Sequence, residues 1–424
     1  MSDTTASAPR GLSLGPAAPW IFAIILVVIL PFIFTDRSTT TIMNQIAITV
    51  VFALSYNMLL GQGGMLSFGH AVYMGLGGFF VMHIMNRIEM YGWFIPLPLL
   101  PLFAGIFGMA FAALFGTFSV RRAGTAFAMI SLGIGELIAA SSIIIVAFFG
   151  GEEGISGDRT MGPNIFGVEW LTPGEVYWVI TGWMLLSALL MYLFSRTPAG
   201  RMANAVRDNP ERAQFLGYNE ARVRYISFCA AGFFAGVAGG LFAINYEILG
   251  EENLNLVTSG TILLVTFLGG AGFFFGPIVG AIVFTLLQTV LSLHTNLWQL
   301  YAGVLFVTTV MFFPQGIAGL LAMHIAPWKL GRFPSLLAPY LKTLIPGLIG
   351  LLGLCAFIEI LHHAKHSAIG DDQMTLFWTS FSSHDALPWV ISGGLAIAGI
   401  LLARKAAPDM VEAYSNAATL EQTR

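Results

Sequence analysis

Residues 97–118 read LPLLPLFAGIFGMAFAALFGTF and contain no charged side chain. A helix needs roughly 20 mainly apolar residues to cross the hydrocarbon core of a bilayer. In lipid the backbone must satisfy its own hydrogen bonds, which a helix achieves within one segment. This stretch therefore predicts a transmembrane helix.

The rest of the chain has the same character. Of its 424 residues, 56% are hydrophobic and 10% are charged, whereas soluble proteins carry about 25% charged residues. This composition excludes a soluble globule, a disordered chain, a coiled coil and a secreted disulfide scaffold. The net charge of −3 argues against nucleic acid as a partner. Cys229 and Cys355 lie in apolar runs and are expected to be small packing or lipid-facing residues.

We predict an all-α integral membrane protein: a polytopic bundle of about ten core transmembrane helices with Gly-rich broken or re-entrant segments, plus two extra C-terminal helices. Barrel strands are excluded because they would alternate apolar and polar residues over about ten positions. The first run is expected to be a retained span, since no small-residue cleavage site follows it. The core spans are expected near 18–35, 41–60, 68–86, 97–118, 124–149, 176–195, 224–244, 257–275, 277–293 and 297–314, and the extra spans near 341–361 and 387–403.

Basic residues predict the orientation. Of the 19 Lys and Arg residues, only four fall in the segments that become external when the N-terminus is inside, namely Arg37, Arg87, Arg159 and Lys365. Cytoplasmic loops carry the excess of Lys and Arg, so both termini are expected in the cytoplasm. The expected parts are a cytoplasmic tail (1–17), a transmembrane domain (18–320), a basic cytoplasmic linker (321–342) and a two-helix extension with a cytoplasmic tail (343–424).

The inner loop at 196–224 reads RTPAGRMANAVRDNPERAQFLGYNEARVR. Asn209 is a suitable N-cap, Pro210 fits a first helical turn, and Gly217 can close a helix in the left-handed region, so 211–216 is predicted to be a short helix. A preceding helix over 200–208 places Met202, Ala205 and Val206 near one face. Two interpretations stay open: a docking element for a soluble partner, or a loop whose arginines only fix topology.

Two glycine clusters interrupt the apolar runs. Glycine permits close helix approach and backbone breaks at membrane depth, where a break must be lined by protein or a water-filled cavity. For the clusters as a whole we favour a pathway lining, although packing alone explains any single glycine. His70 beside the first cluster can contact solute or simply bond a neighbouring helix. The predicted pathway residues are Gly61, Gln62, Gly64, Ser67, Gly69, His70, Glu136, Gly269, Gly270, Gly272 and Gly276.

Glu136 is the only acidic residue within the ten core spans. A carboxylate at this depth costs about 2.5–3.5 kcal/mol on insertion scales, so it needs a partner or an aqueous cavity. Arg121 and Arg122 are too far along the same helix to pair with it. A gate or lining residue and a structural hydrogen bond between helices are equally good explanations.

No G-x-x-x-x-G-K-[ST] segment occurs, so the chain is not expected to bind ATP, and no catalytic constellation is recognisable. The histidines at 362, 363, 366 and 384, with Asp371 and Asp372, are interpreted as a polar interfacial loop rather than a metal site. We expect no cofactor and no metal in this chain.

Four regions resemble the permease subunits of bacterial ABC importers for branched-chain amino acids and the related urea and amide permeases, and within them the LivM-type group. They are NMLLGQGGMLSFGHAVYMGLGG (57–78), RRAGTAFAMISLGIGE (121–136) followed by GGEEGISG (150–157), the inner loop at 200–219, and LLVTFLGGAGFFFGPIVGA (263–281) with FFPQGIAGL (312–320).

The resemblance implies a non-catalytic inner-membrane subunit that pairs with a second, homologous permease subunit. Two cytoplasmic ATPase subunits and a periplasmic solute-binding protein complete the importer. The implied solute is a branched-chain amino acid, with urea or short amides as alternatives. By the same resemblance, coupling to the ATPase falls on Gly200, Arg201, Met202, Ala205, Val206, Arg207, Asn209, Glu211, Arg212, Ala213 and Gly217.

Two other classes of transport protein are alternatives. An ion-coupled secondary transporter would use Glu136 and His70 as its coupling pair, and a passive channel would share a glycine-lined pore. Neither gives the long inner loop a role. The acidic outer loops at 150–158 and 247–252 are expected to receive the binding protein. The C-terminal extension departs from the resemblance, and we expect it to shield the permease edge or recruit another protein.

Overall fold

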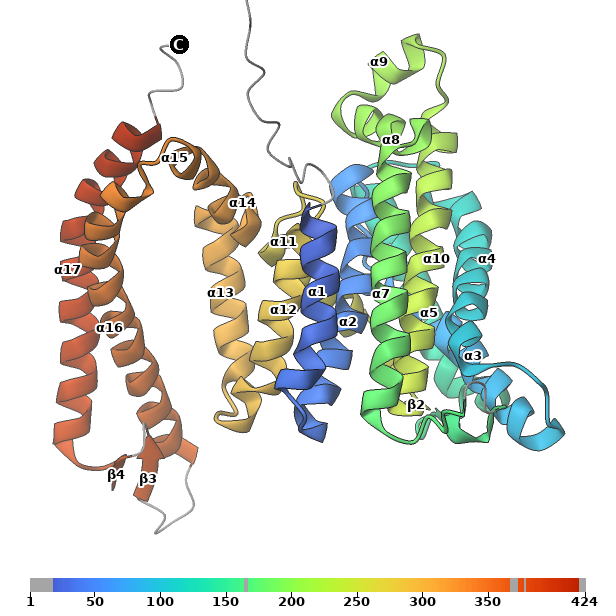
Figure 1. Ribbon diagram of the computed structural model, residues 1–424, viewed down its shortest axis with the longest axis horizontal. Helices are drawn as coiled ribbons and strands as arrows, with labels where there is room; N and C mark the ends of the chain where they lie inside the picture. The colour runs from blue at the N-terminus through green and yellow to red at the C-terminus, as the bar shows by residue number, and fades with distance from the viewer. Residues whose placement is uncertain (1–17, 164–166, 367–372, 377–378, 419–424) are drawn as a thin grey trace, which may run out of the picture. The chain divides into compact units, whose positions relative to one another are not determined.

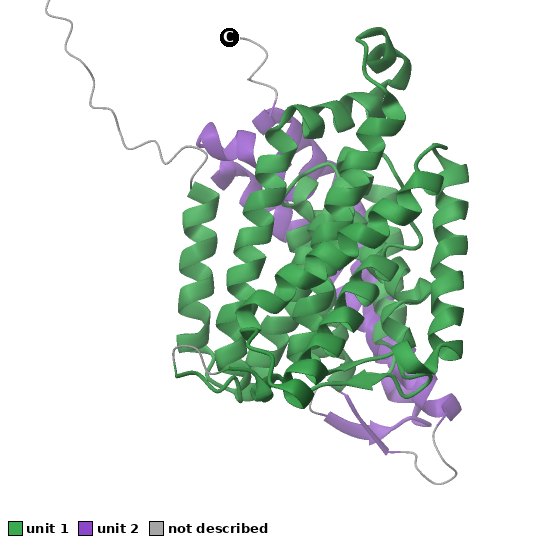
Figure 2. Cartoon of the chain, turned by 90° about the vertical axis from the view of Figure 1, so that its right-hand side faces the viewer, with its two compact units in different colours: residues 1–319 green, residues 320–424 purple. Residues whose placement is uncertain are grey.

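The computed structural model describes residues 18–163, 167–366, 373–376 and 379–418. The predicted N-terminal tail lies outside the described residues. The chain forms two units, residues 1–319 and 320–424, which Figure 2 shows in different colours.

Unit 1 is a bundle of helices (Figure 1). Its elements are α1 (Ala18–Ile33), α2 (Arg37–Asn57), η2 (Met58–Gln62), α3 (Ala71–Tyr91), η3 (Leu97–Leu99), α4 (Leu100–Ser119), α5 (Thr125–Ile144), α6 (Val146–Phe149), β1 (Ile155–Ser156), η4 (Arg159–Met161), α7 (Pro173–Arg196), α8 (Pro198–Asp208), α9 (Pro210–Phe215), α10 (Glu220–Tyr246), β2 (Ile248–Leu249), η5 (Glu251–Asn253), α11 (Leu256–Gly269), α12 (Gly276–Thr289), η6 (Leu291–Leu293) and α13 (Trp298–Phe312). The short helix α14 (Gly316–Met323) follows.

The all-α polytopic prediction is confirmed, and a helix overlaps every predicted span. The number of full-length spans is lower than the number of predicted runs. Within the described residues, eight helices are long and apolar enough to cross a membrane, or nine if the bent pair Trp298–Phe312 and Gly316–Lys329 counts as one. The helices α1 and α11 have 16 and 14 residues, fewer than the roughly 20 that a straight crossing needs.

Small residues allow the central helices to approach closely. A Cβ atom added at Gly236 of α10 would lie 2.3 Å from the carbonyl oxygen of Ala104 in α4. On another face of α10, a Cβ added at Gly239 would lie 1.8 Å from the carbonyl oxygen of Met74 in α3. Membrane helices lack a hydrophobic driving force between them, so contact between backbones supplies much of their association. The helices α3, α4 and α10 therefore form a closely packed centre.

Unit 2 is a helical hairpin. It comprises α15 (Ile325–Lys329), α16 (Phe333–His366), β3 (Gln373–Leu376), β4 (Thr379–Ser382) and α17 (Ala386–Ala418). The long helices meet at glycines, since a Cβ added at Gly399 would lie 2.4 Å from the backbone nitrogen of Gly350. The strands β3 and β4 pair antiparallel, with Met374 opposite Phe381. The Tyr414 hydroxyl near the end of α17 donates to the carbonyl of Met323, a residue of unit 2 and the last of α14, at 3.3 Å.

Candidate coupling and translocation site

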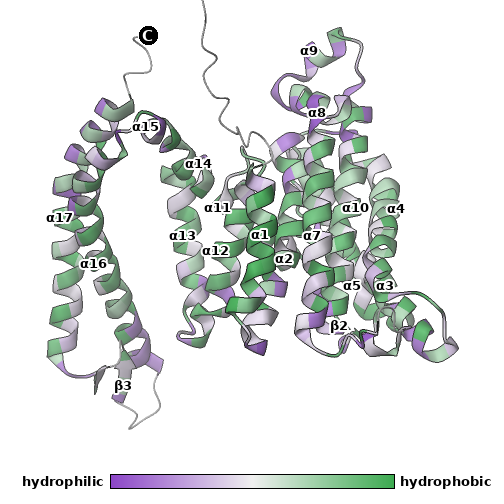
Figure 3. Cartoon of the chain, viewed as in Figure 1, coloured by the Kyte–Doolittle hydropathy of each residue, from purple (hydrophilic) through white to green (hydrophobic). Residues whose placement is uncertain are grey.

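The inner loop folds as its sequence predicts. Thr197 caps α8 by accepting a hydrogen bond from the backbone nitrogen of Gly200, and Asn209 caps α9 by accepting one from Arg212 at 2.9 Å. Pro210 occupies the first turn of α9, and Gly217 has a φ of +86°. The two short helices project from one end of the bundle, and Figure 3 shows hydrophilic residues gathered on them.

Some apolar residues of the inner loop are buried against one another, and others are exposed. Ala203, Val206, Ala213 and Val223 form a small core of their own, with Met202 packed against it. Val206 is 1% exposed, so it supports the loop rather than presenting a surface. The exposed apolar residues are Phe215 at 91% and Leu216 at 68%, at the end of α9. Sequence reasoning did not assign these two, although an apolar pair inside a polar segment is a readable signal.

The other predicted coupling residues surround this core. Gly200 is buried, and it packs closely on the end of α7: a Cβ there would lie 2.3 Å from the carbonyl oxygen of Phe194. Ala205 is half-buried. The exposed members are Arg201, Arg207, Asn209, Glu211, Arg212 and Gly217.

The span that begins with α2 is broken at the first glycine cluster. The α-helix widens into the π-helix η2, and the chain then turns at Gly64, whose φ is +63°. Residues 65–70 return alongside α2, because the Tyr56 hydroxyl donates to the carbonyl of Ser67 at 2.9 Å and the Ser55 hydroxyl lies 3.0 Å from Nε2 of His70. Only then does α3 begin, so the predicted break is present between the second and third spans.

His70 lies in an aromatic enclosure and is fully buried. Its ring stacks on Phe52 at a centroid distance of 5.5 Å and meets Tyr56 and Tyr73 edge-on. In the described part of the chain, four buried polar atoms around the break have no hydrogen-bond partner: Asn57 Oδ1, Gln62 Oε1, Ser67 Oγ and His70 Nδ1. Buried polar atoms ordinarily have partners, so this group retains capacity for water or a polar solute.

The second glycine cluster joins α11 to α12 and touches the first. Its glycines pack backbone against backbone, since a Cβ at Gly269 would lie 2.1 Å from the carbonyl oxygen of Gly276. Gly270 packs against Gln315 and Gly316, whereas Gly272 has open space beside it. A Cβ added at Gly61 would lie 2.2 Å from the carbonyl oxygen of Ala271. The two clusters are thus one contact region, and a pathway role for the second remains a prediction.

The helix α5 has a packed face and an exposed face. On the packed face, Ser131 Oγ accepts a hydrogen bond from the backbone nitrogen of Phe68 at 3.0 Å, and Gly69 approaches the Ser131 carbonyl so closely that a Cβ would lie 2.2 Å from it. Glu136 lies on the exposed face. This face also carries Met129, Gly133, Leu137, Ala140 and Ile144, spaced three or four apart. Within the described ranges no hydrogen bond or ion pair reaches the Glu136 carboxylate.

The opposite end of unit 1 is held together by Arg159. Its guanidinium donates to the carbonyls of Trp170 and Leu171 and to those of Ile244 and Asn245, at 2.8–3.2 Å. It also pairs with Glu247 at 3.5 Å. This cation sits at the C-terminal carbonyls of α10, where the helix dipole favours positive charge. The strands β1 and β2, with Ile155 opposite Leu249, complete this platform.

The same end carries the acidic loops. A hollow of about 450 Å³ is lined by the carboxyl-bearing residues Glu152, Glu153, Glu251 and Glu252 together with Ile143, Phe242, Tyr246, Ile248, Gly250 and Asn253. Nearby, hydrogen bonds from the hydroxyl and backbone nitrogen of Thr160 hold the pKa of Asp158 below its ordinary value, since they favour the charged carboxylate. Asp158 therefore keeps its negative charge at neutral pH.

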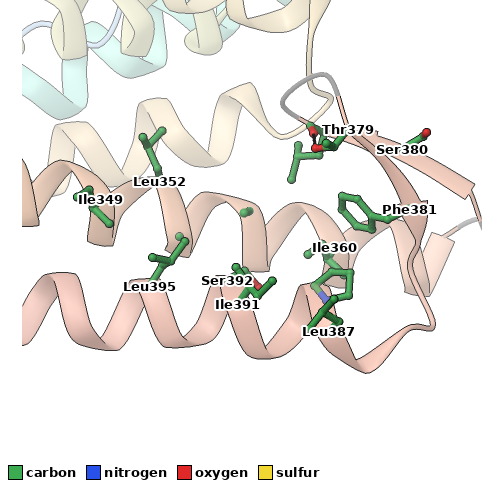
Figure 4. A pocket seen from close by; sticks show the side chains of 14 residues that line it. Ile349, Leu352, Ile360, Thr379, Ser380, Phe381, Leu387, Ile391, Ser392 and Leu395 are labelled. Carbon is green, nitrogen blue, oxygen red and sulfur yellow. Dashed lines mark hydrogen bonds between the residues drawn. The ribbon is translucent and has the colours of Figure 1, made fainter.

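Unit 2 contains a separate cavity of about 600 Å³ between its long helices and the β3–β4 hairpin. Figure 4 shows Leu352, Leu395 and Phe381 among its lining side chains, and the lining is almost wholly apolar. It offers few groups to a polar solute. Asp371 and Asp372 lie outside the described residues. Among the residues that the structure describes, no group of three metal-binding side chains occurs.

Comparison with known proteins identifies the bundle. The family model "Branched-chain amino acid transport system / permease component" matches residues 38–313, which include both glycine clusters, α5 and the inner loop. The chain belongs to this family. The permease match ends before unit 2 begins.

Curated relatives agree with this assignment. The high-affinity branched-chain amino acid transport system permease protein LivM of Escherichia coli K12 is 26% identical over 317 residues, covering 69% of this chain and 73% of the relative. LivH of Salmonella typhimurium is 25% identical over 283 residues, covering 63% of this chain and 90% of LivH. The autoinducer 2 import system permease protein LsrC of Klebsiella pneumoniae is 30% identical over 161 residues, covering 36% of this chain and 47% of LsrC. No solved structure matches the chain.

As a member of this permease family, the chain is a non-catalytic transport subunit of a bacterial ABC importer. It is an integral protein of the bacterial inner membrane that works with ATPase and binding-protein subunits.

Proposed function

We propose that this permease translocates a branched-chain amino acid, together with a second homologous permease subunit, two ATPase subunits and a periplasmic binding protein. The similarity to LivM supports the choice of solute. The observation that carries the docking of the ATPase subunits is the exposed apolar tip formed by Phe215 and Leu216 on a capped, two-helix inner loop. An apolar anchor on a rigid element is the kind of surface that fills a groove on a soluble partner.

The orientation follows from charge. The positive-inside bias favours a cytoplasmic position for α8 and α9, where the ATPase subunits are. The beginning of α1 lies at the same end, because Trp20 contacts Tyr192 near the end of α7 with ring centroids 5.5 Å apart. These two observations support a cytoplasmic N-terminus. The acidic hollow lined by Glu152, Glu153, Glu251 and Glu252 then faces the periplasm. We propose that it receives a basic surface of the binding protein there.

The pathway is proposed to run along the exposed face of α5. A carboxylate on a lipid-facing helix surface is costly, so the face around Glu136 fits an aqueous pathway or the second permease subunit better than lipid. The opposite face of α5 contacts residues 68–69 of the broken span. A displacement of that segment would expose the unpaired polar atoms of Ser67 and His70 to the same pathway.

An ion-coupled transporter working alone is the weaker candidate. No hydrogen bond or ion pair among the described residues joins Glu136 to His70, and His70 is fully buried between Ser55 and three aromatic rings. The inner-loop tip also has no role in such a transporter. A passive channel leaves the tip equally unexplained.

Solute choice is tested by removing the chain from a cell that has its partner subunits. We expect uptake of low micromolar leucine, isoleucine and valine to fall to background and to return with the intact gene. Urea and acetamide uptake serve as controls and are expected to stay unchanged. Loss of urea or amide uptake with normal leucine uptake would assign the chain to the amide branch instead.

A further inference from the structure

Arg207 of α8 connects the inner loop to the broken span. Its guanidinium donates to the carbonyl oxygen of Gly61 in η2, and its Nε donates to Asp208 at 2.9 Å, which orients the side chain. Gly61 lies in the last turn before Gly64, where carbonyl oxygens lack partners from the helix itself. A cation at such a helix end satisfies a free carbonyl and is favoured by the helix dipole. The inner loop therefore caps the C-terminal end of α2 and η2.

The turn at Gly64 is shaped around the same side chain. A Cβ added at Gly64 would lie 2.6 Å from Cγ of Arg207, and the φ of +63° is one that other residues rarely adopt. Both the backbone conformation and the space beside it thus require glycine while Arg207 is in place. This is a fitted contact rather than a chance approach of an exposed arginine.

Gly61 is held on its other side by the turn between α11 and α12. A Cβ at Gly61 would lie 2.2 Å from the carbonyl oxygen of Ala271. One turn earlier, the Asn57 side-chain amide donates to the carbonyl of Phe273 at 3.3 Å. A displacement of the Gly61 backbone therefore also moves the second glycine cluster.

The segment after Gly64 reaches the remaining helices of the proposed pathway. Phe68 donates its backbone N–H to Ser131 of α5 at 3.0 Å, and Ala71 donates its own to Ser259 of α11 at 3.1 Å. Because closely packed backbones cannot deform continuously, a shift at the Gly61 end is passed on as a shift of these contacts.

We propose that Arg207 is the positioning residue that transmits movement of the inner loop to the broken span, and that it acts by holding the Gly61 carbonyl rather than by contacting the ATPase. The inference rests on the proposed docking of the ATPase at α8 and α9. Arg207 then has a role that differs from docking. The amount of solute transported per ATP depends on Arg207, whereas association of the ATPase subunits does not.

The test uses the complete importer, purified and reconstituted in proteoliposomes with its binding protein. Arg207→Ala, Arg207→Lys and Gly64→Ala are compared with Arg122→Ala, an exposed arginine on the turn between α4 and α5 that lies outside the inner loop. Three quantities are measured: co-purification of the ATPase subunits, ATP hydrolysis, and solute transported per ATP.

We expect Arg207→Ala to retain ATPase association and ATP hydrolysis while solute transported per ATP falls about tenfold, because a charge-assisted hydrogen bond is lost. Arg207→Lys should recover part of the ratio, since a lysine ammonium can still reach a carbonyl. Gly64→Ala should lower the ratio as well, because the added methyl displaces the Arg207 stem. Arg122→Ala should match the wild type in all three measurements.

Two results would overturn the inference. A wild-type ratio of solute to ATP in Arg207→Ala would show that the Gly61 contact transmits nothing. Loss of ATPase association in both Arg207→Ala and Arg207→Lys would make Arg207 a docking residue, which removes its transmitting role but leaves docking at the inner loop intact. Failure of docking itself would appear separately, as unchanged ATPase association when the Phe215 tip is altered. If Arg207→Ala does not assemble, the lysine and Gly64 variants decide between these results.

Discussion

Replacing Phe215 with aspartate is expected to abolish co-purification of the ATPase subunits and, with it, ATP-driven uptake. The ring is 91% exposed on a capped helix, so it makes little packing contact within its own chain. A buried aromatic anchor at the centre of an interface contributes about 2–4 kcal/mol, which corresponds to roughly a 30- to 1000-fold loss of affinity. A carboxylate in the same groove adds the cost of burying an unpaired charge. Leu216→Asp should have the same effect, and both are measured by affinity purification of the complex from membranes.

The matched control is Gln214→Asp, which adds the same charge one residue away on the exposed surface of α9 without removing an apolar side chain. It is expected to leave membrane insertion and ATPase association close to the wild type. Full association in Phe215→Asp and Leu216→Asp would remove the inner-loop tip from the docking site. Equal loss in the Gln214 variant would indicate a charge effect rather than an apolar anchor.

A cysteine at position 136 is expected to react with a water-soluble, membrane-impermeant thiol reagent far faster than a cysteine facing lipid. The thiolate is the reactive species. Ionised groups at the centre of a span cost about 2.5–3.5 kcal/mol in lipid, so a lipid-facing thiol has roughly 100-fold less thiolate available. Glu136→Cys is made with Cys229 and Cys355 replaced by alanine, and labelling is followed in the assembled complex without nucleotide and with trapped ATP.

Ile24→Cys provides the comparison, because Ile24 is 49% exposed on α1, whose residues 18–33 carry no charge. Labelling of position 136 in at least one of the two nucleotide states supports the pathway along α5. If positions 136 and 24 label equally slowly in both states, the exposed face of α5 does not line water. The second permease subunit would then cover it.

Local rules predicted the inner loop well. Asn209, Pro210 and Gly217 each occupy the helix-end position that their chemistry favours, and this depends only on neighbours in sequence. The break at the first glycine cluster was also foreseeable, since clustered glycine at membrane depth has few other uses.

Other features depend on tertiary contacts that no local pattern carries. The helical spacing predicted one apolar face of Met202, Ala205 and Val206, but the small core contains Met202 and Val206 with Ala203 rather than Ala205. Only the packing of α8 and α9 against Val223 of α10 turns Val206 inward and leaves Phe215 outside. The meeting of Gly61 with Ala271, across 210 positions of sequence, is equally invisible locally. The sequence predicted that the Glu136 carboxylate is energetically costly at membrane depth, but its position on the exposed face of α5 follows only from the structure.

The most direct test of the coupling mechanism is accumulation of leucine against its gradient in proteoliposomes that contain this chain, its permease partner and its binding protein, with and without the ATPase subunits. We expect uphill uptake only when the ATPase subunits and ATP are both present, and none under an imposed proton gradient. Uphill uptake driven by protons in vesicles that lack the ATPase would contradict it.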